Sequence, residues 1–405
     1  MIEKPSAGKE GGSKWPSLLL FGAATFLFWA SLYLYVPILP LYAESQGASL
    51  LMVGAIIASY AIAQLLLRAP IGIWADFLRR RKPFVVAGLL FASMGALVLA
   101  AAPSPWFLFA GRAISGVAAA TWVISSVFFA SYFPPERSAR GIGIISFING
   151  AALVVATSVG GQLAEVWGAE SVFFAGAVLG VVGALFLLPV AEPAVHRTLA
   201  SSDSTFLKVA THPVLLMASL MSVFVHFGSA ATISSFTLVY AARIGASPAD
   251  LGFVSAAYLG SATLATLGAI YLVERRGYSA TIVLGAAIMG VSLLATPFIT
   301  ELGPFVGLQI LSGAGRGLVN TALMALSIRA VPPAQRATAM GVYQALYSIG
   351  MLAGPIVGGI AADELGLASV FYMSGAAVLL AGGLASLLSP GGQLMEGARQ
   401  PGRKV

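Results

Sequence analysis

The chain has 405 residues, of which 58% are hydrophobic and only 9% are charged, and its mean hydropathy is +0.91. This composition excludes an ordinary soluble protein and is typical of a chain that crosses a membrane many times. The net charge of +7 comes from cations scattered over short loops, which argues against a nucleic-acid partner. The chain has no cysteine, so disulfides and thiolate metal sites are excluded.

Twelve apolar segments follow one another along the chain, and each is long enough for a membrane helix of about 20 residues. Six of them lie near 17–43, 50–74, 84–102, 105–132, 141–165 and 170–190. The other six lie near 213–242, 249–273, 279–299, 303–330, 339–363 and 368–389. The segments are too long for barrel strands, so we expect an all-α polytopic protein. Its expected parts are a tail over 1–16, a six-helix bundle over 17–190, a linker over 191–212, a second bundle over 213–389 and a tail over 390–405.

Lysine and arginine fall almost entirely in the two tails and in the even-numbered loops between these segments. The odd-numbered loops hold one cation, Arg243, and are otherwise acidic. By the positive-inside rule, both termini lie in the cytoplasm. We therefore expect a multi-pass protein of a plasma membrane, which in bacteria is the inner membrane.

The two halves of the sequence repeat with a constant offset of 198 residues, which separates Tyr42 from Tyr240 and Tyr60 from Tyr258. The same offset relates Gly47 to Gly245, Pro134 to Pro332, Gly160 to Gly358 and Gly168 to Gly366. Each unit has six segments, so the second copy enters the membrane in the orientation of the first. Parallel repeats of this kind place a solute path at their interface, near the midplane.

The densest group of charges in the first half lies at 72–83, between the second and third segments. Asp76 follows Gly72 by four residues and comes shortly before the run of cations at 79–82. Under the offset, Asp76 corresponds to Glu274, so the loop has a counterpart in the second half. An arginine-rich loop that only sets topology would explain the cations but not the placement of the Asp and the Gly.

This loop resembles the signature that the major facilitator superfamily carries between helices 2 and 3, Gly-x3-Asp-Arg-x-Gly-Arg-Arg. The matching residues are Gly72, Asp76, Arg80 and Arg81, while Phe77 and Arg79 depart from the pattern. Arg112 followed by Gly116 is similar to the family's pattern in helix 4. The resemblance covers nearly the whole chain and extends to bacterial twelve-helix drug and metabolite exporters.

The resemblance implies a transporter built from two six-helix bundles that open alternately to the two sides of the membrane. It also implies a cytoplasmic gate, at which Asp76 faces the N-terminal end of helix 11, where the helix dipole favours an anion. The gating residues that it implies are Gly72, Asp76, Arg80, Arg81, Glu274, Arg275 and Gly277. The implied partners are a small-molecule solute, protons and the lipid bilayer; no cofactor is expected, and the protein is expected to be a monomer.

The eleventh segment is rich in glycine, in a pattern similar to that of helix 5 in drug exporters of this family. The pattern comprises Gly341, Gly350, Gly354, Pro355, Gly358 and Gly359, and here it lies in the second half. Small residues allow close helix packing, and a proline perturbs the helix where two halves must rock. Ordinary glycine packing explains the pattern as well, so it favours an exporter only modestly.

Three arginines lie inside the predicted spans, where a charge costs roughly 2.5–3.5 kcal/mol on insertion scales and faces the protein interior by default. Arg68 is close to the cytoplasmic end of its span, so we expect its stem to extend to the membrane surface. Arg112 and Arg316 lie deeper, on helices that line the cavity in the family architecture, and hydrogen bonding to backbone carbonyls is the alternative role for both. The candidate cavity residues are Arg112, Arg316, Asn320, His226, Trp29, Tyr33, Gln64, Ser146, Asn149, Gln344 and Tyr347.

No Asp or Glu lies near the middle of a predicted span. A carrier of lipophilic cations normally needs a buried acid, so this cavity favours an amphipathic solute that is neutral, zwitterionic or anionic. We expect a secondary transporter that works by alternating access as a proton-linked exporter, that is, by antiport. The groups available to carry the proton are His226, Glu44, Glu165 and Asp363.

Two other interpretations remain open at the level of sequence. An importer or uniporter of an organic anion would use the same cavity, and a non-transporting sensor or scaffold could share the fold. An enzyme is not expected, because the three histidines are not at metal-ligand spacing and no nucleophile, base and acid can be placed on one membrane face.

Overall fold

The computed structural model describes residues 15–78, 80–134, 137–192, 208–329, 331–332 and 335–387. Every regular element in these residues is a helix. The first half comprises α1 (Trp15–Tyr33), α2 (Leu39–Ser45), α3 (Leu50–Leu78), α4 (Lys82–Ala100), α5 (Pro105–Ala120), α6 (Trp122–Ala130), α7 (Ser138–Trp167) and α8 (Ala169–Leu187).

The second half repeats this order from Pro213 onward. It comprises α10 (Pro213–Ala231), the π-helix η2 (Thr232–Phe236), α11 (Thr237–Arg243), α12 (Pro248–Ala295), the 3-10 helix η3 (Thr296–Phe298), α13 (Leu302–Arg329), α14 (Arg336–Leu365) and α15 (Ala368–Ser386). The pairs α1 and α10, and α7 and α14, begin and end 198 residues apart, so the offset in the sequence is an offset between equivalent helices.

Prolines and glycines set several of the helix ends. Pro105, Pro213 and Pro248 stand at the first turn of their helices, where no backbone donor is lost. Gly168 and Gly366 separate successive helices at a φ of 84°, a conformation that side chains other than glycine rarely adopt.

Ten helices in the described part of the chain are long and apolar enough to cross a membrane. One of them, α12, has 48 residues and is divided by Gly277, whose φ of 81° and ψ of 173° break the helix into two spans. Adding α13, which has 28 residues, gives the twelve spans expected from the sequence.

Three predicted spans are interrupted within the membrane. The first is broken between α1 and α2 around Pro37, the fourth at Thr121 between α5 and α6, and the seventh at the π-helix η2. Apolar periodicity does not show such breaks, because the residues around them are as apolar as the helices that they separate.

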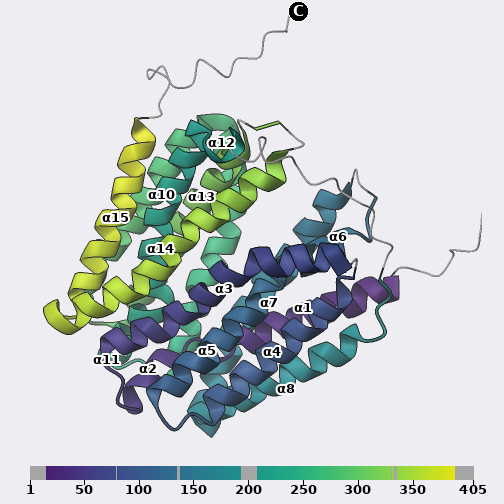
Figure 1. The fold of residues 1–405 in the computed structure, drawn as a ribbon. Coiled ribbons are helices and arrows are strands. Elements are labelled where there is room, and N and C mark those ends of the chain that lie inside the picture. The colour runs from purple at the N-terminus through teal and green to yellow at the C-terminus, as the bar shows by residue number, and fades with distance from the viewer. Residues whose placement is uncertain are drawn as a thin grey trace, which may run out of the picture.

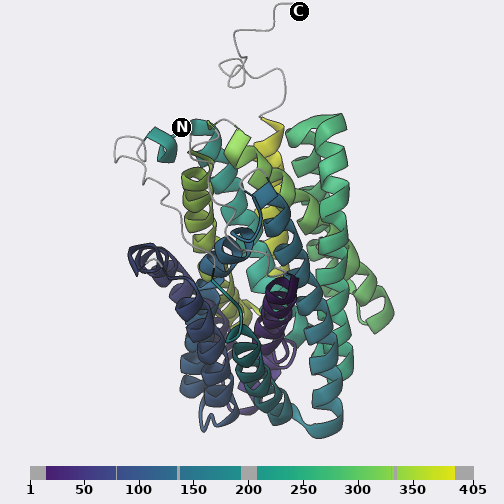
Figure 2. The same ribbon diagram turned by 90° about the vertical axis from the view of Figure 1, so that its right-hand side faces the viewer.

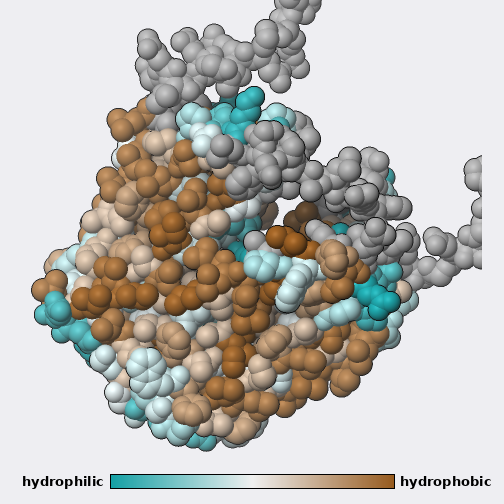
Figure 3. Space-filling view, in the orientation of Figure 1, coloured by the Kyte–Doolittle hydropathy of each residue, from teal (hydrophilic) through white to brown (hydrophobic). Residues whose placement is uncertain are grey.

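The twelve spans form two bundles of six helices, coloured purple to teal and green to yellow in Figures 1 and 2. Each bundle has a buried cluster of apolar side chains, and a third cluster joins both halves near the ends of α2 and α11. Figure 3 shows apolar residues over the middle of the visible face and hydrophilic residues at its upper and lower edges, as a bilayer requires.

The two halves meet mainly through α3 with α14 and through α7 with α12. Glycines allow these contacts: a Cβ on Gly54 would clash with the backbone of Pro355, and one on Gly161 would lie 2.8 Å from the Cα of Gly252. These residues lie toward the side that the charge pattern assigns to the exterior. Toward the opposite side the halves diverge, and the molecule is hollowed between them (Figures 1 and 3).

Candidate functional site

Arg112 on α5 is buried, with only 3% of its surface exposed. Its guanidinium carbon lies 4.2 Å from the ring centre of Tyr60 and 5.8 Å from that of Tyr35. Such cation–π contacts are attractive, but they leave the N–H donors unused. Nε and Nη1 of Arg112 have no hydrogen-bond partner among the described residues. A buried guanidinium in this state is stabilised by any ligand that brings an acceptor or a negative charge.

Tyr33 on α1 connects this arginine to the other half of the molecule. Its hydroxyl lies near that of Tyr60 and is close enough to both Arg112 and Arg316 to interact with them electrostatically. The guanidinium carbon of Arg316, on α13, lies 5.9 Å from the ring centre of Tyr258. These five residues, Tyr33, Tyr60, Arg112, Tyr258 and Arg316, are called the central cluster below.

The central cluster is only partly symmetric. Gly116 packs against the backbone of Tyr60, and Gly313 packs against that of Tyr258, so the two helix pairs are equivalent. Arg112 comes four residues before its glycine and Arg316 three residues after its own. Seven residues of helix amount to about 10 Å along the axis, so the Cα atoms of the two arginines lie at different depths.

Other hydrogen-bond donors near the cluster are also unused. The indole Nε1 of Trp29, the hydroxyl of Tyr258 and the hydroxyl of Ser312 are buried without partners in the described part of the chain. Trp29 packs against Tyr33 with ring centres 5.9 Å apart, and Ser312 lies one turn before Arg316 on α13. The site therefore offers donors and aromatic rings to a ligand that supplies acceptors.

His226 on α10 lies stacked on Tyr347 of α14, with ring centres 4.1 Å apart and planes inclined by 9°. Its Nδ1 lies 2.9 Å from the carbonyl oxygen of Ser222 and 3.1 Å from the hydroxyl oxygen of the same residue. Arg316 is within electrostatic reach of the imidazole. His226 is thus held at the edge of the central cluster by its own helix and by α14.

Arg68 on α3 does not extend to the membrane surface, and here the interpretation of the sequence was wrong. Its guanidinium donates to Gln64 on the same helix and, over 3.3 Å, to Oε1 of Gln344 on α14. The two predicted cavity residues Gln64 and Gln344 are therefore bridged by an arginine, across the two halves. The side-chain amides of Gln64 and Gln344 accept hydrogen bonds from the guanidinium, which makes this position more favourable for Arg68 than one extended to the membrane surface.

The remaining predicted cavity residues lie apart from these contacts. On α7, Ser146 is exposed and Asn149 is half-buried, and no described hydrogen bond joins either to the central cluster. Asn320 is half-buried one turn after Arg316.

The predicted proton-carrying acids lie at the outer side, away from the central cluster. Asp363 accepts the backbone amides of Leu50 and Leu51 at 3.0 and 2.9 Å, and Glu165 accepts that of Ala249 at 3.1 Å. Each carboxylate thereby caps the first turn of a helix from the other half, and the two caps are related by the offset of 198 residues. Glu44 is paired with Arg243 at 3.9 Å.

The predicted gate lies where the two halves diverge. Gly72 is in the last turns of α3 and a Cβ there would meet nothing within 4 Å, so the loop is not packed closely in this conformation. Glu274 and Arg275 are exposed on α12 just before the break at Gly277. Arg80 is exposed, and the backbone amide of Arg81 is bonded to Glu192. The side chain of Asp76 lies outside the described residues.

The glycines of α14 lie at helix contacts, except Gly341, where a Cβ would meet nothing within 4 Å. A Cβ on Gly350 or Gly354 would clash with carbonyl oxygens of α10, and one on Gly359 would lie 2.7 Å from the Cα of Leu51. Gly358 faces Phe236 and Val370, and Pro355 lies inside the helix. The pattern therefore packs α14 simultaneously against its own bundle and against the other half.

Sequence reasoning missed three members of the site, Tyr60, Tyr258 and the bridge made by Arg68. The repeat did contain a signal, because Tyr60 and Tyr258 occupy equivalent positions. Their role became visible only when the rings were found beside Arg112 and Arg316.

Comparison with known proteins agrees with this architecture. The Major Facilitator Superfamily profile matches residues 21–244 and again 218–400. The multi-drug resistance efflux pump PmrA of Streptococcus pneumoniae is 27% identical over 86% of this chain and 89% of its own length. An uncharacterized MFS-type transporter of Methanocaldococcus jannaschii is 25% identical over 84% of this chain and 89% of its own length. Multidrug resistance protein 1 of Bacillus subtilis is 26% identical over 84% of this chain and 87% of its own length.

Solved structures share the fold at lower identity. A bacterial homologue of the human lysosomal transporter Spinster, in an inward-facing and occupied conformation, superposes with a TM-score of 0.78 at 20% identity, covering 92% of this chain and 96% of that one. The nucleoside transporter NupG superposes with a TM-score of 0.72 at 18% identity, covering 92% of this chain and 99% of that one. These relatives are transporters rather than enzymes. The chain therefore belongs to the major facilitator superfamily and is a multi-pass membrane transporter.

Proposed function

We propose that this transporter exports a small amphipathic solute by alternating access, driven by a proton gradient, from the cytoplasm across the inner membrane of a bacterium. Both termini would be cytoplasmic and the working unit a monomer. The named efflux pumps among its relatives support export, and the divergence of the halves on the cytoplasmic side supports uptake of the solute from within.

The observation that carries the proposal is the buried guanidinium of Arg112, whose Nε and Nη1 have no hydrogen-bond partner among the described residues. With Arg316 at a second depth and no carboxylate bonded to either among the described residues, the central cluster supplies positive charge, aromatic faces and free donors. Of the neutral, zwitterionic and anionic solutes that the sequence favours, an anionic one compensates this charge best. Its apolar part would lie against Trp29 and Tyr33.

The proposal is tested by flux into and out of proteoliposomes, with naphthalene sulfonate and naphthyl trimethylammonium as probes that share a ring system and differ in charge. An imposed proton gradient should drive the sulfonate in one direction and the ammonium in neither. An antiporter should move the sulfonate opposite to the flow of protons, whereas a proton-coupled importer should move it in the same direction as the protons, and reversing the gradient should reverse the flux in both cases. No flux of any probe, under either gradient, would favour a sensor or scaffold.

Arg112→Gln and Arg316→Gln should each reduce sulfonate flux at least tenfold, since losing a charge-assisted hydrogen bond costs about 1.5–3 kcal/mol. Arg329→Gln is the matched control, because Arg329 lies at the inner end of α13 and packs on Tyr278, 5.1 Å from its ring centre. Thermal unfolding followed by tryptophan fluorescence establishes that the variants are folded. Full flux in both central variants would overturn the assignment of the site.

A further inference from the structure

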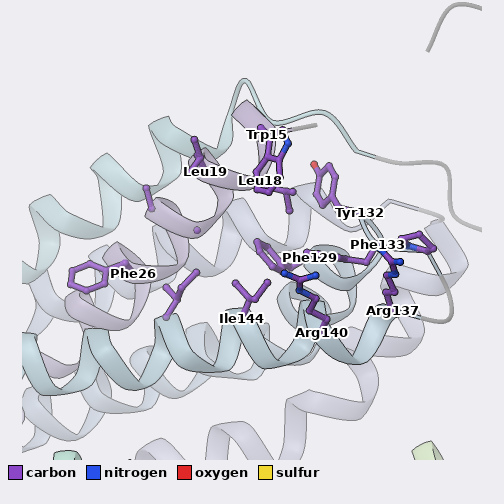
Figure 4. A pocket seen from close by; sticks show the side chains of 14 residues that line it. Trp15, Leu18, Leu19, Phe26, Phe129, Tyr132, Phe133, Arg137, Arg140 and Ile144 are labelled. Atoms are coloured by element: carbon purple, nitrogen blue, oxygen red, sulfur yellow. The ribbon is translucent and has the colours of Figure 1, made fainter. Parts of the chain in front are cut away.

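A groove separate from the central cluster lies at the inner end of the first bundle, between α1 and α7 (Figure 4). Its cavity volume is about 690 Å³, within the range of about 300–1,000 Å³ typical of small-molecule sites. The end of α6 contributes Phe129, Tyr132 and Phe133. The α1 wall presents one apolar face of the helix, comprising Trp15, Leu18, Leu19, Gly22, Ala23 and Phe26.

Two arginines line one end of this apolar groove. The side chains of Arg137 and Arg140, at the start of α7, point toward it beside Phe129 and Phe133 (Figure 4). Both are exposed, and neither has an ion-pair partner within the residues that the structure describes. Glu136, the acid of this loop, lies outside those residues. The hydroxyl of Tyr132 is already used, because it donates to the carbonyl of Ala191.

The groove is not a general consequence of the fold, because the equivalent positions of the second bundle differ. The buried positions of α1 and α10 match at an offset of 197 residues, at which Gly22 and Ala23 correspond to Ser219 and Leu220, and the larger side chain of Leu220 would reduce the space. At the offset of 198 residues between α7 and α14, Arg137 and Arg140 correspond to Gln335 and Thr338, so the second bundle has no charge at these two positions, although Arg336 follows directly after Gln335. The cavity and this pair of cations therefore occur together in one half.

We infer that this groove binds one anionic phospholipid of the cytoplasmic leaflet, with an acyl chain along α1 and the phosphate on Arg137 and Arg140. The positive-inside rule places this end of α7 at the cytoplasmic surface, where anionic lipids collect and basic pockets between helices bind their headgroups. The aromatic side chains Trp15 and Tyr132 are of the kind that lies at the membrane interface. The chain's own tail is a poor occupant, because residues 1–14 are mostly polar or glycine.

The experiment places the full chain in nanodiscs with equal amounts of phosphatidylglycerol and phosphatidylcholine of the same acyl chains, and counts retained lipids by native mass spectrometry. The native chain should retain phosphatidylglycerol in preference to phosphatidylcholine. Arg137→Gln with Arg140→Thr introduces the residues of the equivalent helix and should weaken retention about 30-fold, since each basic residue contributes about 1 kcal/mol.

The control variant, Arg329→Gln with Arg336→Gln, removes the same charge from the inner side of the second bundle and should retain the lipid. A second variant, Gly22→Leu with Ala23→Leu, fills the groove with larger apolar side chains and should lose the lipid with both arginines in place. If that variant does not fold, the arginine pair and its control decide the matter.

Equal retention of the two lipids by the native chain, or equal loss in the control, would overturn the inference. It would also be overturned if octanoate, a soluble anion, displaced the lipid at low concentration, or if a second copy of the chain were retained instead. The readout is binding rather than flux, so it is independent of the proposed function.

Discussion

At the scale of single residues, the polar side chains within the spans are arranged by the need for partners. Arg68 donates hydrogen bonds to two glutamine amides, one of them 276 residues away in sequence, whereas Arg112 retains unused donors. A buried cation with donors that have no acceptor among the described residues is a cost that the fold alone does not explain. The contrast between these two arginines is the reason for assigning a structural role to Arg68 and a ligand to Arg112.

A residue-scale prediction concerns pH and Glu44. Burial raises the pKa of the Glu44 carboxyl above its ordinary value of 4.5, although the nearby Arg243 opposes this. The folded state therefore binds the proton more tightly than the unfolded chain, and the stability gained from it is present at low pH and lost as pH rises through the raised pKa. Glu44→Gln should accordingly unfold at a higher temperature than the native chain at neutral pH, and this difference should vanish on acidification.

This prediction is checked by tryptophan-detected thermal unfolding in detergent between about pH 4 and pH 8, a range that spans the titration of a perturbed carboxyl. Glu301→Gln, at an exposed position on the same side, should show no such dependence. A difference between Glu44→Gln and the native chain that persists unchanged at low pH would contradict the assignment.

At the scale of helices, two helix ends on the side that the charge pattern assigns to the exterior are capped by the opposite half of the molecule. Asp363 closes the first turn of α3 and Glu165 closes that of α12, so two carboxylates hold the outer side shut in this conformation. Both were predicted as proton carriers, and a cap that loses its charge on protonation would release the outer side. This proton-carrying role remains a prediction, in which protonation of the two acids accompanies opening of the outer side during the transport cycle.

Removing the charge of these caps should open the outer side. A carboxylate at a helix N-terminus contributes about 0.3–1 kcal/mol, so Glu165→Gln with Asp363→Asn should raise the ratio of outer-open to outer-closed molecules roughly three- to thirtyfold. The chain has no cysteine, so spin labels at introduced cysteines report without background. Glu170→Cys in the first half and Leu365→Cys in the second place the labels on exposed outer residues.

The matched control is Glu364→Gln, which removes the same charge from the exposed neighbour of Asp363. Its distance distribution should equal that of the labelled native chain. An unchanged distribution in the capping variant would show that the carboxylates do not hold the two halves together.

At the scale of the whole molecule, we propose that the two bundles form a pair that closes at one side at a time. The outer caps are formed here, while the glycine of the predicted inner gate, Gly72, has open space around it. We expect the converse arrangement when the inner side closes, with Asp76 at the N-terminal end of α14. The outer acids Asp363 and Glu165 and the inner acid Asp76 would then favour opposite states of the equilibrium between the outer-closed and outer-open forms.

This competition predicts opposite effects on the same pair of spin labels. Asp76→Asn should shift the distance distribution of the labels toward the outer-closed form, because the substitution weakens the state that is open to the outside. It should also slow sulfonate flux without changing the affinity for the sulfonate in a conformer that is locked in one state. Asp76→Glu, which keeps the charge, should restore most of the shift. A distribution and flux equal to those of the native chain would exclude a gating role for Asp76.

Much of this architecture follows from the sequence alone, because it depends on properties that are local or additive along the chain. Twelve spans and two equivalent halves follow from apolar length, loop charge and a constant offset. The central positions of Arg112 and Arg316 follow from the cost of exposing a charge to lipid. None of these inferences requires knowing the angle between two helices.

The tertiary structure decided what depends on contacts between distant residues. It paired Arg68 with Gln344, set Tyr33 between two arginines from different halves, and placed Asp363 on α3, 312 and 313 residues away in sequence. It also left a groove where Gly22 and Ala23 are small. Such contacts arise from the packing of preformed helices, which a pattern along one helix does not contain, and for that reason only the folded chain showed them.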